Sequence, residues 1–132
     1  MNLSTRLTAL VAIGIFGIGA VVFASQPSAV VDGDSIHLAW YGLARLDGID
    51  TPELHGRCPD EIYRAVTARY ILIELLRHRP LDVQILPHRD KYGRLLVKIT
   101  AAGADVAATL IATGVARPYS GGKRLGWCNG EP

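Results

Sequence analysis

The stretch R-L-D-G-I-D-T-P-E, residues 45–53, decides the fold because it places three carboxylates three residues apart behind one arginine. A helix would stack those carboxylates on one face, where like charges repel. Gly48 and Pro52 lie inside the stretch, and both disfavour a helix. The chain is therefore expected to bend here and to gather negative charge beside a fixed cation, Arg45. Unless another cation binds, these acids would repel one another and loosen the site.

Length and composition indicate one globular domain. The chain has 132 residues, of which 49% are hydrophobic and 20% are charged. Lys and Arg number 14 against 12 Asp and Glu, so the formal net charge is +2. This balance is no polybasic footprint, and by itself it does not predict nucleic-acid binding.

Residues 1–24 have the pattern of an export signal. A short start with one positive charge precedes an apolar or small run over residues 7–23, and Val22-Phe23-Ala24 has the pattern of a cleavage site. The alternative is an uncleaved membrane anchor, because a run of ~17 residues is at the lower edge of a spanning length. The cleaved signal is favoured. In both cases residues 25–132 form the domain, and it faces an extracytoplasmic compartment, periplasmic or secreted.

The two cysteines, Cys58 and Cys128, both follow this leader. In an oxidising compartment such a pair can form one disulfide, which is the favoured interpretation. The bridge would hold the C-terminal tail against the start of the first long helix. The alternative is two unrelated free thiols, and neither cysteine has the near partners of a metal site.

Apolar periodicity predicts a β-rich α+β chain: three strands, a helix, two strands and a helix. The apolar face of the first helix is expected from residues at three- and four-residue spacing, among them Ile62, Ala65, Val66 and Tyr70. One helix between the third and fourth strands suggests a small, partly open five-stranded barrel of the OB type. The expected strands are 29–31, 35–40 (with Ile36, Leu38 and Trp40 on one side), 43–46, 81–86 and 94–100, the expected helices are 59–77 and 104–113, and the tail after Gly114 is expected to be irregular.

Two acidic turns, Asp32-Gly33-Asp34 and Asp50-Thr51-Pro52-Glu53, adjoin two of these strands. If the strands are neighbours, the carboxylates and a carbonyl converge into a hard oxygen site that suits Ca²⁺ or Mg²⁺. Each turn alone is also explained by backbone preferences, because Asp and Gly are common in turns. Arg45 and Arg94 would complete a set suited to phosphodiester hydrolysis, in which arginines bind phosphate charge and a free carboxylate acts on water.

Three ordered motifs, V-V-D-G-D-S, R-L-x-G-I-D-T-P-E and D-K-Y-G-R, together with G-x-A-R-P-Y, make the chain resemble the thermonuclease (staphylococcal nuclease) family over about residues 30–119. The resemblance implies an OB-fold barrel. It also implies Ca²⁺-dependent hydrolysis of single-stranded DNA or RNA with little sequence preference, leaving 3′-phosphate ends. The alternative is a weakly active or inactive OB-fold module that binds nucleic acid or protein. Nothing in the sequence requires more than a monomer.

The resemblance also implies a role for each matched residue. Asp34, Asp50 and the backbone carbonyl of Thr51 match the Ca²⁺ ligands, and Asp32 matches an acid that contacts the metal through water. Glu53 matches the proposed general base. The phosphate-clamping arginines are Arg45 and Arg94, and the residues near the bound nucleotide are Lys91, Tyr92 and Tyr119.

Four other polar side chains near these motifs are not expected to be catalytic. Asp47 is interpreted as structural, pairing with a neighbour, and none of His55, His78 and His88 has a counterpart in the chemistry of the family. The loop after Glu53 is shorter than in the staphylococcal enzyme, so the pose of Glu53 is left open.

Overall fold

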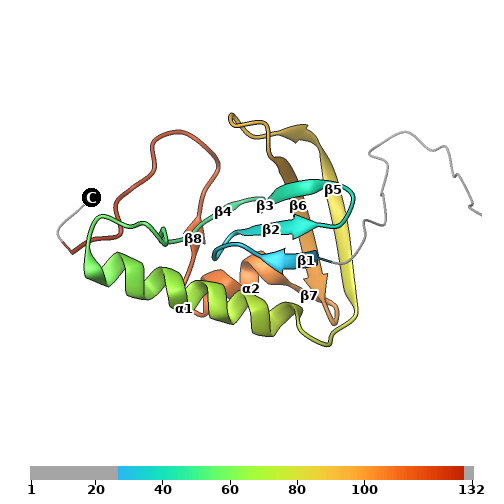
Figure 1. Cartoon of the computed structure of the whole chain (residues 1–132), viewed down its shortest axis with the longest axis horizontal. Helices are drawn as coiled ribbons and strands as arrows, with labels where there is room; N and C mark the ends of the chain where they lie inside the picture. Colours follow the sequence, from blue (N-terminus) through green and yellow to red (C-terminus); the bar gives the residue numbers. More distant parts are fainter. Residues whose placement is uncertain (1–26, 130–132) are drawn as a thin grey trace, which may run out of the picture.

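A mixed β-sheet forms the framework of the domain in the computed structural model, which describes residues 27–129 (Figure 1). The strand order is β1-β2-β3-β6-β5, with β3 and β6 parallel and the other pairs of this path antiparallel. This β-rich α+β arrangement confirms the OB-type fold, although no pairing within residues 27–129 joins β1 to β5 to close the barrel. The strands of the path are β1 (Pro27–Val30), β2 (Ser35–Leu38), β3 (Gly42–Leu46), β5 (Leu81–Arg89) and β6 (Leu95–Ala101).

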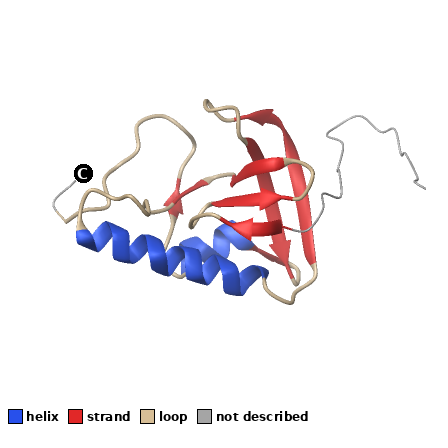
Figure 2. Cartoon of the chain, viewed as in Figure 1, coloured by secondary structure: helices blue, strands red, loops and turns tan. Residues whose placement is uncertain are grey.

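Two helices, α1 (Pro59–Leu76) and α2 (Val106–Ala112), lie together along the same side of the strands (Figure 2). The first helix begins as predicted, because Pro59 occupies its first turn and Cys58 is the N-cap. Buried side chains from both helices and from the sheet form one core, which includes Ile36, Leu46, Leu72, Val97 and Leu110.

The apolar face predicted for α1 is confirmed at Ala65 but was wrong at its three larger members, Ile62, Val66 and Tyr70. Ile62, Val66 and Tyr70 are 40%, 55% and 61% exposed, whereas Ala65 and Ala68 are fully buried. The reason is a close approach of the backbone, since a Cβ at Gly33 would lie only 2.8 Å from the Ala68 Cβ. Only a small helix residue fits against that turn, so the alanine side of the helix faces inward.

Three further expectations are corrected by the structure. Trp40 is not in β2 but in the following turn, with a φ of 72° and 95% exposure. The second helix begins two residues later than expected, because Ala104 and Asp105 form β7 against β6, and Asp105 then caps the helix. The tail is not wholly irregular, because β8 (Arg117–Pro118) pairs with the short strand β4 (Ile49–Asp50).

The leader lies outside the described residues, as do residues 130–132. Within residues 27–129, none of the helices has both the length and the apolar character needed to cross a membrane.

Candidate active site

A cleft of about 770 Å³ opens where the start of β2, the end of β3, the β5–β6 loop and the tail come together. Asp50 and Thr51 are buried, with 0% and 2% exposure, beside residues that line the cleft. The structure therefore brings the two acidic turns and both predicted arginines to one place. The predicted site residues that line the cleft are Asp32, Asp34, Arg45, Glu53, Lys91, Tyr92, Arg94 and Tyr119.

Asp34 is held between its own turn and the neighbouring strand. Its Oδ1 accepts a hydrogen bond from the Ser35 hydroxyl at 3.0 Å, and its Oδ2 accepts one from Arg45 at 3.0 Å. Burial raises the pKa of Asp34 to about 6; Arg45 opposes this shift, whereas the charges of Asp32 and Glu53 add to it. Removal of the Asp34 carboxylate from water thus outweighs the stabilisation that Arg45 and Ser35 give to its charged form.

Arg45 lies opposite Ser35 in the antiparallel β2–β3 pair, which is why it reaches Asp34. Its guanidinium also donates to the Ile49 carbonyl at 2.7 Å and lies 3.9 Å from Asp50 Oδ1. The ring of Tyr119 covers it at 5.5 Å. In this structure Arg45 thus binds Asp34 and Asp50 and lines the cleft.

Asp50 is fully buried and is surrounded by basic and indole donors from the tail. Arg117, its partner in the β4–β8 pair, donates to Oδ2 at 2.8 Å, and Trp127 Nε1 donates to the same oxygen at 3.1 Å. Arg124 Nε donates to Oδ1 at 2.6 Å. Neither arginine nor the tryptophan was predicted as a site residue.

Arg124 bridges the groups predicted to work together. Besides Asp50, its guanidinium contacts the Thr51 carbonyl at 3.1 Å and Glu53 Oε1 at 2.5 Å. Burial works to lower the pKa of Arg124, but its bonds to Glu53 and Asp50 outweigh that effect and raise it. Arg124 is therefore charged while it lies among these oxygens.

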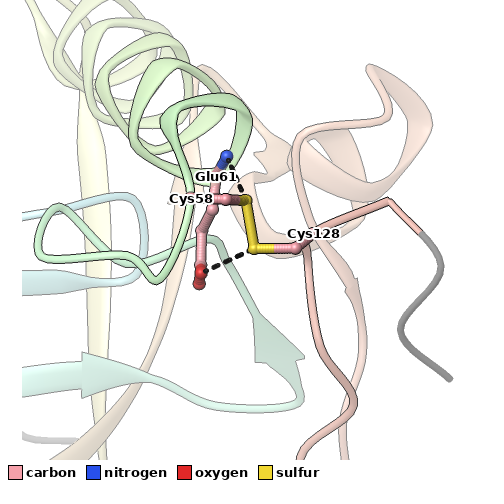
Figure 3. A group of neighbouring side chains, drawn as sticks. All are labelled: Cys58, Glu61 and Cys128. Atoms are coloured by element: carbon pink, nitrogen blue, oxygen red, sulfur yellow. Dashed lines mark hydrogen bonds between the residues drawn. A yellow bond between two sulfur atoms is a disulfide. The ribbon is translucent and has the colours of Figure 1, made fainter.

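The sequence held one signal that could have located these tail residues. The structure confirms the Cys58–Cys128 disulfide, which joins the tail to the start of α1 (Figure 3). Arg124 precedes Cys128 by four residues, and Glu53 precedes Cys58 by five. A formed bridge therefore brings Arg124 into the neighbourhood of Glu53.

Glu61, in the first turn of α1, binds the loop that joins Glu53 to the disulfide. It is only 5% exposed, and its carboxylate accepts hydrogen bonds from the backbone N–H groups of Glu53 at 3.3 Å and Arg57 at 2.9 Å. Its Oε2 also lies 3.8 Å from the sulfur of Cys128 (Figure 3). The short loop after Glu53 is therefore fixed from both ends.

The opposite wall of the cleft is formed by the β5–β6 loop. Arg94 Nε donates to Asp90 at 2.6 Å and its backbone N–H donates to the same carboxylate at 2.9 Å. Burial works to raise the pKa of Asp90, but these bonds and one from the backbone of Tyr92 lower it overall. The ring of Tyr92 contacts two cations, with its centroid 5.0 Å from Lys91 Nζ and 5.5 Å from Arg94 Cζ.

The remaining candidates are placed as follows. Tyr119 contacts Arg45 through its ring, and its hydroxyl donates to the Gly122 carbonyl of the tail at 2.8 Å. Asp47, interpreted as structural, lines the cleft, as does His88. His55 and His78 are exposed and do not line it.

The candidate ligands of the site are all oxygens, the donor type that a hard divalent cation takes. Asp34 and Asp50 each have a carboxylate oxygen within 4.0 Å of one nitrogen of Arg45, so they face a common region. The guanidinium of Arg124 touches both Asp50 and the Thr51 carbonyl. Carboxylate and carbonyl oxygens are the ligands that Ca²⁺ prefers. Asp32 Oδ1 accepts a hydrogen bond from the backbone N–H of Asp34 at 3.1 Å.

An OB-type sheet with this acidic and arginine-rich cleft defines a nuclease-like domain. The model of the family described as staphylococcal nuclease homologue (SNase) matches residues 44–124, more than half of the chain. The protein therefore belongs to the SNase family. The match starts after Asp32 and Asp34 and ends at Arg124. The comparison with curated proteins found no match.

Proposed function

We propose that the protein is a Ca²⁺-dependent nuclease that hydrolyses phosphodiester bonds of single-stranded DNA or RNA, with little sequence preference and 3′-phosphate products. The observation that carries the proposal is the meeting of Asp34 and Asp50 at Arg45, beside a cleft that Glu53 and Arg94 line. The Thr51 carbonyl is joined to Asp50 through Arg124. Membership of the SNase family supports the same activity.

The acidic residues of the cleft would bind the cation and activate water. Asp34, Asp50 and the Thr51 carbonyl would hold the cation, with Asp32 acting through water. The bound ion would polarise the phosphoryl group and stabilise its charge. Glu53, whose side chain is 49% exposed, can accept a proton from water at the mouth of the cleft.

The arginines and aromatic residues act on the nucleic acid itself. Arg45 and Arg94 can bind the phosphate oxygens as planar double donors and stabilise the charge that grows there. Lys91 and Tyr92 lie beside Arg94, where the next nucleotide would pass. Tyr119 offers a ring for base stacking at the other wall.

A second candidate is a catalytically weak or inactive module that binds nucleic acid or protein. The observation that favours it is the engagement of Glu53 and Asp50 by Arg124, which neutralises a metal ligand and the candidate base together. The two candidates are separated by whether catalysis appears when Ca²⁺ is supplied.

The test is hydrolysis of single-stranded DNA and RNA by the purified protein with Ca²⁺ and with chelator. Glu53→Gln and Arg94→Ala are expected to reduce the rate by at least about a hundredfold. Glu74→Gln and Arg64→Ala are matched controls on the surface of α1, away from the cleft lining, and are expected to retain the rate. Chelator-resistant hydrolysis, or full activity in both cleft variants, would contradict the proposal.

We further infer an extracytoplasmic monomer whose leader is cleaved, with membrane anchoring through residues 7–23 as the alternative. The Cys58–Cys128 disulfide supports an oxidising compartment. Mass spectrometry of the protein from fractionated cells, under non-reducing conditions, would show the N-terminal residue and the bridge together.

A further inference from the structure

The tail arm, residues 119–128, delivers a positive charge to the oxygens of the proposed cation site. The arm leaves β8, loops outward and returns to the start of α1 (Figure 1). Gly121 and Gly122, with φ of 100° and 86°, turn it back. Arg124 then points inward, onto Asp50, Thr51 and Glu53.

The arm is fastened to the domain on both sides of Arg124. Before it, the Tyr119 backbone N–H donates to the Gly48 carbonyl at 2.9 Å, and the Tyr119 hydroxyl donates to the Gly122 carbonyl within the arm at 2.8 Å. After it, Arg117 donates to the carbonyls of Leu125 and Gly126, and the disulfide holds Cys128. The position of Arg124 is therefore built into the fold rather than left to a free chain end.

The contacts of Arg124 coincide with the groups assigned to the metal. A guanidinium that donates to Asp50 Oδ1 and to the Thr51 carbonyl uses the oxygens that Ca²⁺ would require. Two cations at the same oxygens repel each other at short range, so they compete for the site. The Arg124 side chain is 38% exposed, so it has an open path away from the site.

We propose that Arg124 is a built-in competitor of the divalent cation, and that the disulfide-bound tail arm holds it in place. This inference rests on the proposed function, because it takes Asp50 and Thr51 as cation ligands. In the closed state Arg124 neutralises Asp50 and occupies Glu53. Binding of the cation requires the guanidinium to withdraw, and withdrawal also frees the Glu53 carboxylate.

The apparent affinity for Ca²⁺ then includes the equilibrium of the arm. A ligand that binds only the open state has its affinity reduced by the fraction of molecules that are open. The hydrogen bond from the charged Arg124 to the buried Asp50 carboxylate is strong enough to make that fraction about one tenth or less. Removing the guanidinium should therefore strengthen Ca²⁺ binding by about tenfold.

The experiment is calorimetric titration of the purified protein with CaCl₂, comparing wild type, Arg124→Gln, Arg124→Lys and Lys123→Gln. Lys123 is an exposed neighbour in the same arm, so Lys123→Gln removes the same charge without removing the contacts. Arg124→Gln is expected to bind about tenfold more tightly than wild type, with Arg124→Lys between them. Lys123→Gln is expected to stay within about twofold, because exposed charges are screened.

If Arg124→Gln binds Ca²⁺ no more tightly than wild type or Lys123→Gln, Arg124 is not a competitor, while the cation site itself stands. If none of the four proteins binds Ca²⁺, the cation site fails, and the competition fails with it.

The role of the tether is tested with the pair Cys58→Ser, Cys128→Ser in the same titration. Serine at position 58 can still cap α1, because the cap is a side-chain acceptor for the Glu61 N–H. The pair is expected to bind Ca²⁺ more tightly than wild type, and to add nothing when combined with Arg124→Gln. A gain that is fully additive with Arg124→Gln would show that the bridge acts by another route.

Discussion

Loss of the Cys58–Cys128 disulfide is expected to lower the free energy of unfolding by roughly 4 kcal/mol. The two cysteines are separated by 70 residues. In the chain-entropy model, closing a loop of about 70 residues removes roughly 15 cal/mol/K from the unfolded chain, which is roughly 4 kcal/mol at 25 °C.

The assay is urea unfolding, followed by circular dichroism, of wild type and the Cys58→Ser, Cys128→Ser pair. With a slope of about 1.5 kcal/mol per M for a small domain, the midpoint should fall by about 2–3 M. Wild type measured with reductant is the control, because it loses the same bond without a substitution.

The structure also defines the result that would refute this reasoning. Asp50 binds the tail through Arg117, Arg124 and Trp127, so the tail has anchors besides the disulfide. If those anchors unravel locally before the domain unfolds, the bridge constrains only the tail. A loss below about 1 kcal/mol with an unchanged slope would show this, and would contradict the loop-closure account.

Three further outcomes are expected. Gly33→Ala should lower stability by about 1–3 kcal/mol in thermal unfolding, since its Cβ would meet Ala68 at 2.8 Å; an unchanged midpoint would mean that the turn and helix can separate at no cost. Asp90→Asn should cost about 1 kcal/mol at pH 7 and progressively less as the pH falls below about 4. The sign follows because the folded-state pKa of Asp90 is lowered, so its stabilisation is present above the unfolded pKa and is lost on acidification; a cost independent of pH would exclude this ionic origin. Ca²⁺ at about a hundred times its dissociation constant should raise the free energy of unfolding by about 2.7 kcal/mol, and Asp34→Asn should abolish the rise in a thermal shift measurement; an equal rise in that variant would place the ion elsewhere.

Local sequence patterns were sufficient to predict strands β2 and β3, which position Asp34 and Arg45. Alternation around Ile36 and Leu38 predicted β2, and the following strand brought Arg45 opposite Ser35 as a hairpin requires. The meeting of Asp34 with Arg45 follows from that register. The family motifs supplied the remainder of the fold, since pattern alone did not distinguish an OB barrel from other α+β domains.

The orientation of α1 could not be derived from apolar spacing, because the helix carries two apolar stripes. Ile62, Val66 and Tyr70 are larger than Ala65 and Ala68, and burial of the larger set would usually be favoured. The close approach of Gly33 to Ala68 reverses that choice. This is a long-range steric fact that no window of the helix sequence contains.

The repulsion among the carboxylates of residues 45–53 is relieved by tail arginines and not by neighbours in the sequence. Among nearby residues only Arg45 opposes the acids, so repulsion in the absence of a metal was expected. The structure instead brings Arg117 and Arg124 from the tail, more than sixty residues later, onto Asp50. Burial of Asp50 without such partners would be costly, so the tail arginines allow the acidic turn to fold before any ion binds. Under the proposed function the same contacts oppose entry of the ion, so its binding would exchange one cation for another rather than fill a void.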